Sequence, residues 1–189
     1  MAPSTAQLKP GISIVGHAIV SADGMIADAA GEMPAALRND ADWQAFQSAL
    51  DRAALVVLGR VGHARHPNPG RRRLVLTRSV PTLRPDTSDP LALLWNPLGM
   101  PLAHVLDVLE IAEGSVAVTG GTGVFDHFIG RYDRFDLSEI HDFVLPGGRP
   151  CFSAGHPRTV LAAAGLAPGR GALIDTAAGV AMTAWLRRA

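Results

Sequence analysis

The sequence predicts one α/β domain with a mostly parallel central sheet, flanking helices and an antiparallel hairpin at its C-terminal end. Apolar, β-branched runs alternate along the chain with segments of helical spacing, which is the order typical of a parallel sheet. Two further apolar runs flank Ala178-Gly179 near the end of the chain, as in a hairpin. The 189 residues suit a single domain. We expect a flexible tail over residues 1–11 and one domain over residues 12–189.

Composition narrows the range of partners. The formal net charge is zero and 48% of the residues are hydrophobic, so no overall field attracts nucleic acid or an anionic membrane. No apolar run is long enough to span a bilayer, and the N-terminal segment lacks the apolar core of a signal peptide. The single Cys151 excludes an internal disulfide. We therefore expect a cytoplasmic monomer or homodimer that binds neither nucleic acid nor membrane. No histidine has metal-ligand spacing, and no metal site is expected.

The first elements are a buried strand and an amphipathic helix. The apolar run from Ile12 to Val20 contains His17 and ends in the turn sequence Ser21-Ala22-Asp23-Gly24. A helix should begin at Asn39 or Asp40, since either side chain can cap it. Its inner face is predicted from the helical spacing of Asp42, Phe46, Ala49, Leu50 and Ala53.

An acid on this apolar face is unusual. Asp42 and Phe46 are neighbours in the first turns of the helix, because residues four apart share one face. The carboxylate either complements the positive end of the helix dipole or faces a ligand. The spacing alone leaves both interpretations open.

The middle of the chain holds two strands that end in arginine. Residues 54–58 form the first, which stops at Gly59-Arg60 before a loop rich in Pro and Gly. Residues 74–77 form the second, followed by Arg78 and a loop that extends to Asp89-Pro90. Between them, Arg72 and Arg73 are expected to form a solvated basic edge.

The remaining elements follow the same alternation. We expect strands over residues 91–95 and 134–140, the latter half-buried, and an amphipathic helix over residues 101–110. A short helix should cover residues 157–164. The closing hairpin is expected to pair residues 171–176 with residues 180–186.

A glycine cluster lies between a strand and a helix at residues 116–125. The β-branched run Val116–Thr119 enters Gly120-Gly121-Thr122-Gly123, and Val124-Phe125 begin a helical segment. Glycines let backbone N–H groups approach a ligand, and a helix N-terminus favours phosphate. The stretch lacks the later glycine of the dinucleotide fingerprint. It is either an anion-binding turn or a simple connection.

Three strand ends are predicted to meet at one edge of the sheet. They carry Gly59-Arg60, Thr77-Arg78 and Gly120-Gly121-Thr122. Ligands of open parallel sheets bind at the carboxyl ends of the strands, so these groups are expected to converge on one phosphate-bearing cofactor.

The order of these motifs, with an Asp-x-x-x-Phe helix before them, resembles the dihydrofolate reductase family from about Ile12 to Phe152. The resemblance implies that family's three-layer α/β fold. It also implies NADPH as the cofactor, hydride transfer to dihydrofolate or a related pterin-like heterocycle, and a place in folate metabolism.

The resemblance also assigns roles to individual residues. On the substrate side, Asp42 would be the catalytic carboxylate, Phe46 would pack on the pterin and Ser138 would support the acid. Arg71 would grip the glutamate carboxylate of folate, and Met33 belongs to a mobile active-site loop. Arg60 and Arg78 would contact phosphates of NADPH, and Gly120-Gly121 would be joined by a cis peptide. The implied cofactor-binding residues are Ala18, Gly59, Arg60, Thr77, Arg78, Gly120, Gly121, Thr122, Gly123 and Val124.

Some residues depart from that family's pattern. Met33-Pro34 is followed by Ala35 in place of tryptophan, and Gly62 replaces a hydroxyl residue. Ser21-Ala22-Asp23-Gly24 resembles the Ser-x-Asp-Gly of the riboflavin-pathway pyrimidine reductases, which share the fold and use NADPH on a ribosylamino-pyrimidine phosphate. Two alternatives therefore stand beside the pterin reductase: a pyrimidine reductase of that kind, and a non-catalytic nucleotide-binding protein with the same fold.

Overall fold

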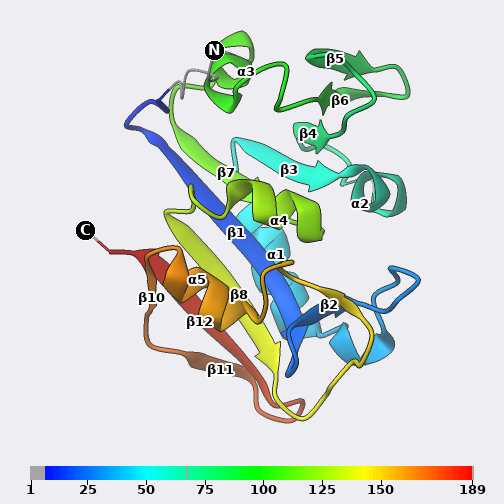
Figure 1. Cartoon of the computed structure of the whole chain (residues 1–189), viewed down its shortest axis with the longest axis vertical. Coiled ribbons are helices and arrows are strands. Elements are labelled where there is room, and N and C mark those ends of the chain that lie inside the picture. Colours follow the sequence, from blue (N-terminus) through cyan, green and yellow to red (C-terminus); the bar gives the residue numbers. More distant parts are fainter. Residues whose placement is uncertain (1–6, 67, 189) are drawn as a thin grey trace.

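A computed structural model describes residues 7–66 and 68–188, and a large twisted sheet forms the centre of this part of the chain (Figure 1). Six strands run parallel and make up its middle: β1 (Ile12–Ser21), β3 (Leu55–Gly59), β4 (Arg73–Leu76), β6 (Asp89–Trp95), β7 (Gly114–Val118) and β8 (Arg134–Ile140). Four antiparallel strands extend it: β5 (Leu83–Asp86), β10 (Leu166–Pro168), β11 (Ala172–Asp175) and β12 (Val180–Arg187).

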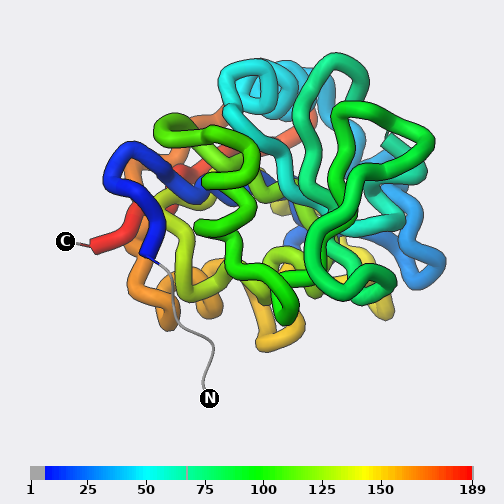
Figure 2. Tube along the Cα trace, turned by 90° about the horizontal axis from the view of Figure 1, so that it is seen from above, coloured from blue at the N-terminus to red at the C-terminus, as the bar shows by residue number. Residues whose placement is uncertain are grey.

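The strand order is β10-β12-β8-β1-β7-β3-β4-β6-β5, with β11 added to β12. Figure 2 shows the β5–β6 hairpin at one end of the molecule and the C-terminal strands at the other. A separate short ladder joins β2 (Met25–Ala27) to β9 (Arg149–Pro150). The predicted mostly parallel sheet with a closing antiparallel hairpin is confirmed.

Helices cover both faces of the sheet, which gives three layers (Figure 1). Helix α1 (Asp40–Asp51) packs Leu50 against Val56 and Ala117 on one face. Helices α3 (Leu102–Val108), α4 (Thr122–Phe128) and α5 (Pro157–Ala163) contribute to the larger cluster on the other. Two short elements complete the set, the 3-10 helix η1 (Ala35–Leu37) and α2 (Arg60–Arg65).

The apolar runs are continuous because the central strands are buried on both faces. In β3, Leu55 and Val57 belong to the large cluster, whereas Val56 and Leu58 pack on the opposite side. The same holds for β8, where every residue from Leu137 to Ile140 is buried. The expected half-buried alternation of this strand is therefore wrong in its second half, because β1 and β12 flank it and both faces are covered.

Two segments predicted as loops contain regular structure. Residues 60–65 form α2, which has no buried residue and so leaves no apolar period in the sequence. Residues 83–86 form β5 at the edge of the sheet, where Pro85 is tolerated because an edge strand need not donate on both sides.

The expected N-terminal tail lies partly outside the described residues. Of its described part, Leu8 packs against the large cluster and Lys9 pairs with Asp107 of α3 at 2.7 Å. None of the helices in residues 7–66 and 68–188 is long and apolar enough to cross a membrane.

Candidate active site

The start of α1 is fixed by a side-chain cap. The Asn39 side chain accepts a hydrogen bond from the Asp42 backbone N–H at 3.0 Å, which satisfies one of the free donors of the first turn. Its amide nitrogen also donates to Asp175 of β11 at 2.7 Å. The first turn of α1 is thereby tied to the C-terminal hairpin, and Asp42 is held at a defined height above the sheet.

Asp42 points toward the sheet and not only along the helix dipole. The hydroxyl of Ser138 on β8, which is 2% exposed, donates a hydrogen bond to the Asp42 carboxylate. Burial raises the pKa of the Asp42 carboxyl above its usual value, and the Ser138 hydrogen bond opposes that rise. The structure thus brings together the acid and the hydroxyl that the resemblance pairs, in a half-buried setting.

Phe46 follows one turn later on the same face. Its ring packs against Trp43 at a centroid distance of 5.8 Å and meets the ring of His17 edge-on at 6.1 Å. Asp42 and Phe46 therefore form a wall with one polar group and one aromatic surface, facing β1 and β8.

The predicted cofactor residues gather at the carboxyl ends of β7, β3 and β4. The Gly59 N–H donates to the Gly120 carbonyl at 3.0 Å, which joins the ends of β3 and the glycine turn directly. Next to them is a pocket of about 320 Å³, whose lining residues are Arg60, Leu76, Thr77, Arg78 and Ser79. Arg60 and Arg78 are exposed there and Thr77 is buried, so two guanidinium groups stand over one concave surface.

The glycine turn has the backbone that the resemblance implies. Gly120 and Gly121 are joined by a cis peptide bond, as expected. Gly120 has φ of +100°, and a Cβ atom there would lie 2.6 Å from the ring of Phe125. Both the torsion and the space therefore require glycine. Gly123 differs, because a Cβ atom on it would meet nothing within 4 Å.

Three other predicted cofactor residues have side chains that contact the rest of the protein. The hydroxyl of Thr122 donates to the Pro150 carbonyl, so it holds the β9 segment. Val124 is buried against the large cluster. Ala18 packs into the same cluster, on the face opposite to α1, so only its backbone is available at the sheet edge.

The two remaining predicted substrate residues are Met33, which is exposed, and Arg71, which is already engaged within the protein. Met33 is 38% exposed, and its carbonyl accepts from Arg38 at 3.2 Å. The Arg71 guanidinium donates to Asp51 at 2.6 and 3.1 Å, to Asn68 at 3.1 Å and to the Gln47 carbonyl at 3.4 Å. Each of its three nitrogens thus has a partner within the protein.

The Arg73 side chain corrects one expectation. The expected solvated basic edge is wrong for Arg73, because this side chain is 1% exposed and its guanidinium pairs with the Asp89 carboxylate at 2.5 Å. Its side chain turns inward because β4 is covered by neighbouring elements, and the carboxylate of Asp89 at the start of β6 supplies the opposite charge. Arg72, as expected, is exposed.

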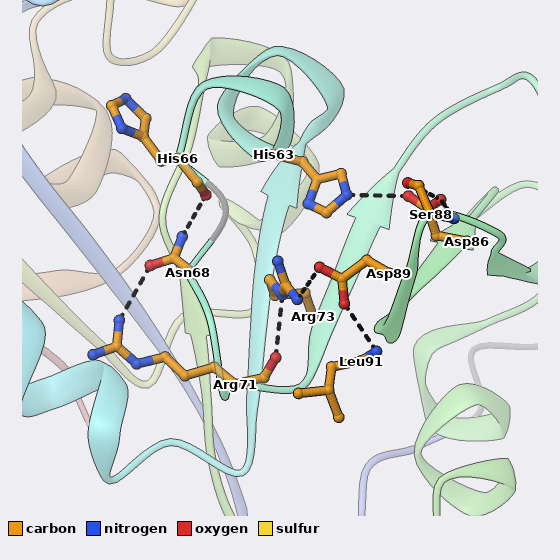
Figure 3. A network of polar contacts seen from close by, with 9 residues as sticks. All are labelled: His63, His66, Asn68, Arg71, Arg73, Asp86, Ser88, Asp89 and Leu91. Carbon is orange, nitrogen blue, oxygen red and sulfur yellow. Dashed lines mark hydrogen bonds and ion pairs between the residues drawn. The ribbon is translucent and has the colours of Figure 1, made fainter.

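Figure 3 shows the polar network around this pair. Asp89 also accepts from the Leu91 N–H at 3.0 Å, and the imidazole of His63 on α2 lies 3.1 Å from Asp86 of β5. The Arg73 Nε donates to the Arg71 carbonyl at 3.1 Å. The network joins α2 and the segment before β4 to the β5–β6 hairpin, and so supports the elements that carry Arg60 and Arg78.

The loop expected to be mobile is held from two sides. Arg65 at the end of α2 donates to the Gly31 carbonyl and pairs with Glu32 at 2.6 Å. From β9, Arg149 donates to the Ala29 carbonyl at 3.3 and 3.4 Å. We call the Arg65 contacts with Gly31 and Glu32 the loop clasp. Sequence reasoning missed the loop clasp, since Arg65, Gly31 and Glu32 form no motif together.

The Ser-x-Asp-Gly turn organises the end of β1. The Ser21 hydroxyl donates to Asp23 at 2.5 Å, and the same Asp23 oxygen accepts from the Leu145 N–H at 2.9 Å. Gly24 has φ of +85°, which favours glycine. The turn thus fixes the loop after β8 to the start of the active-site loop.

The comparisons with solved structures define the class of this molecule. No protein-family model and no curated protein matches the sequence. Solved structures do match almost the whole chain, and they share the dihydrofolate reductase-like fold. The protein therefore has the dihydrofolate reductase-like fold.

Three neighbours illustrate the range of this fold. A protein described as a riboflavin biosynthesis protein, from Shewanella sp. PV-4, has a TM-score of 0.67 and 17% identity, covering 94% of this chain and 99% of its own. Dihydrofolate reductase from Enterococcus faecalis, in complex with NADP(H) and RAB-propyl, has a TM-score of 0.66 and 19% identity, covering 97% and 100%.

The third neighbour is a diaminohydroxyphosphoribosylaminopyrimidine deaminase/5-amino-6-(5-phosphoribosylamino)uracil reductase from Thermotoga maritima. Its TM-score is 0.63 at 15% identity, with 93% of this chain covered. The match spans 56% of that protein's length.

Proposed function

We propose that the protein is an NADPH-dependent reductase that transfers a hydride to a pterin-like or pyrimidine-like heterocycle. The observation that carries this proposal is the pairing of two features along one sheet edge. One is the half-buried Asp42–Ser138 pair, and the other is the pocket lined by Arg60, Thr77 and Arg78.

The residues of the pocket fit a phosphorylated dinucleotide. Two exposed arginines over a concave surface suit phosphate oxygens, which guanidinium groups bind bidentately. The close approach of Gly59 to the glycine turn leaves backbone without side chains beside it. NADPH, when bound, supplies the hydride.

The protein's own groups would orient the acceptor. Carboxylate oxygens of Asp42 accept hydrogen bonds from the amino and ring N–H groups of an aminopyrimidine or pterin ring. Such contacts favour protonation of the ring, while Phe46 offers a surface for the ring face. Holding the ring in one orientation against the nicotinamide is the main catalytic contribution available to this site.

One observation favours the pyrimidine-type substrate over dihydrofolate. The Arg71 nitrogens, which the resemblance assigns to the folate glutamate, are engaged by Asp51, Asn68 and Gln47. A substrate without a carboxylate tail leaves these contacts in place. The Ser-x-Asp-Gly turn at residues 21–24, which resembles that of the pyrimidine reductases, supports the same preference.

The proposal is tested by NADPH oxidation with three acceptors: dihydrofolate, dihydrobiopterin and the ribosylamino-pyrimidine phosphate of riboflavin synthesis. Turnover of any one supports a reductase, and the acceptor used decides between the pterin and pyrimidine alternatives. NADPH binding without oxidation by a wide panel of related heterocycles would favour the non-catalytic alternative. Failure to bind NADPH would overturn the cofactor assignment.

A preference for NADPH over NADH is expected to depend on Arg60 and Arg78. Replacing both by alanine should weaken NADPH binding by about 100-fold, because each removes a charge-assisted contact to phosphate. NADH binding should change much less. The measurement is a fluorescence titration of each nucleotide. Arg72→Ala, which removes an exposed arginine away from the pocket, is the matched control. Equal losses for both nucleotides would argue against phosphate recognition by these arginines.

A further inference from the structure

The buried imidazole of His17 has no role in the function proposed above. It lies within the central strand β1, is 9% exposed and meets the ring of Phe46 edge-on. Its Nδ1 is 3.5 Å from the Asp136 carboxylate on β8, which is directly opposite in the strand register. Burying a polar ring in an apolar strand costs free energy, so its partners and its free nitrogen are informative.

The strand register places His17 next to the Asp42–Ser138 pair. In the ladder between β1 and β8, His17 faces Asp136 and Ile19 faces Ser138. Residues two apart on a strand share a face and are separated by about 6.6 Å, close to the roughly 5.4 Å of one helical turn. Asp42 contacts Ser138, and Phe46, one turn later, contacts His17. The imidazole and the Asp42 carboxylate are therefore polar groups on adjacent rows of the same wall.

Several charges act on the imidazole. Burial lowers the pKa of His17 below its usual value, the carboxylate of Asp136 opposes this, and Arg134 and Arg52 lower it further. At neutral pH the ring is thus uncharged and holds one proton. Asp136 favours that proton on Nδ1, which leaves a lone pair on Nε2. Among residues 7–66 and 68–188, none forms a hydrogen bond with Nε2.

We propose that His17 is a second substrate-binding residue, whose Nε2 accepts a hydrogen bond from an N–H or amino group of the heterocycle held by Asp42. Asp136 is its positioning residue, since it sets the tautomer. This inference rests on the proposed function and deepens it. Two hydrogen-bond acceptors on one wall select a ring that carries two donor groups, which is the class of amino-substituted pyrimidines and pterins. A ring carbonyl turned toward either group would meet a second acceptor, so the bound ring, a uracil included, must present its N–H and amino groups to this wall.

The test uses diaminopyrimidine as a binding probe for the full-length protein, measured by calorimetry. His17→Phe keeps an aromatic ring against Phe46 but removes the acceptor. It is expected to weaken probe binding by about 10-fold to 100-fold, the usual loss when one hydrogen bond to a buried donor is removed. NADPH binding should change little, because His17 does not line the pocket that holds Arg60 and Arg78.

Asp136→Asn supplies a second variant that keeps the imidazole. Asparagine carries no charge that favours the proton on Nδ1, and its amide nitrogen can donate to Nδ1, so a larger fraction of the rings should carry the proton on Nε2, where it replaces the acceptor by a donor. Nitrogen NMR with isotope-labelled histidine reads this directly, since the His17 signals are those absent from His17→Phe. In the wild type the Nε2 signal should shift on saturation with the probe. In Asp136→Asn it should report a larger fraction of protonated Nε2 than in the wild type, with weakened probe binding.

The outcomes separate this inference from the proposed function. If Asp42→Asn weakens probe binding while His17→Phe and the Nε2 signal show no effect, His17 is only a packing residue and the inference is wrong. If neither variant affects the probe, the substrate site itself is misplaced and the proposed function loses its substrate half. Loss in both variants, with an Nε2 shift in the wild type, supports the two acceptors together.

Discussion

Asp42→Asn is expected to lower kcat/KM for the accepted heterocycle by at least about 100-fold, the usual effect of removing a group that assists proton transfer. The amide keeps the shape of the side chain and its bond with Ser138. It cannot present two acceptor oxygens to the ring, and it carries no charge to favour a protonated substrate. Steady-state kinetics with NADPH in excess measures the effect, and NADPH affinity should be unchanged. Near-normal turnover would remove Asp42 from the mechanism.

The same variant should not lose stability at neutral pH. The pKa of Asp42 is raised on folding, so between its ordinary value of 3.8 and the raised value the folded state binds more protons than the unfolded chain. The contribution of this group to stability therefore falls as the pH rises through that interval. Asparagine removes this cost. Thermal unfolding at neutral pH should show Asp42→Asn to be at least as stable as the wild type, with the difference shrinking below the ordinary pKa.

Gly120→Ala is expected to destabilise the protein by about 2 kcal/mol or more. An alanine at φ of +100° is strained, and its Cβ would lie 2.6 Å from Phe125 in the core. Displacement of the turn would also weaken the hydrogen bond that the Gly120 carbonyl accepts from the Gly59 N–H. Denaturant unfolding measures the loss, and NADPH titration should show weaker binding in whatever fraction folds.

Gly123→Ala is the matched control three residues away. Its Cβ would meet nothing within 4 Å, and the residue lies inside α4. Alanine is a better helix former than glycine, so stability should rise by about 0.5–1 kcal/mol. Similar stability for the two variants would mean that the fit of the turn against Phe125 is unimportant.

The order of strands and helices was accessible from the sequence because central parallel strands are buried on both faces. Val56 and Val57 face opposite sides of the sheet and are both apolar, so the run of β3 is continuous and easily recognised. Elements with little buried surface were missed. Helix α2 buries no residue, and β5 is an edge strand that contains Pro85.

The candidate site was accessible where the backbone itself defines it. Gly59, Gly120 and Arg78 were placed at one sheet edge by the general behaviour of parallel strands, and the structure brings their segments together. Pairings between distant side chains left no such signal. The spacing of Arg73 and Asp89 does not show that β4 and β6 run side by side. In the same way, the spacing of His17 and Asp136 does not show that β1 and β8 are neighbours.

The loop clasp has a thermodynamic consequence. Helix α2 has six residues. Its first residue, Arg60, lines the pocket, and its last residue, Arg65, contacts the loop that contains Glu32. One short helix therefore contacts both halves of the candidate site. A ligand that changes the position of α2 would therefore also change how firmly Arg65 holds the loop. By linkage, a ligand enclosed by that loop changes the affinity of the first ligand by the same factor. Cooperativity between the cofactor and the substrate proposed above would thus arise within the six residues of α2, without movement of the sheet.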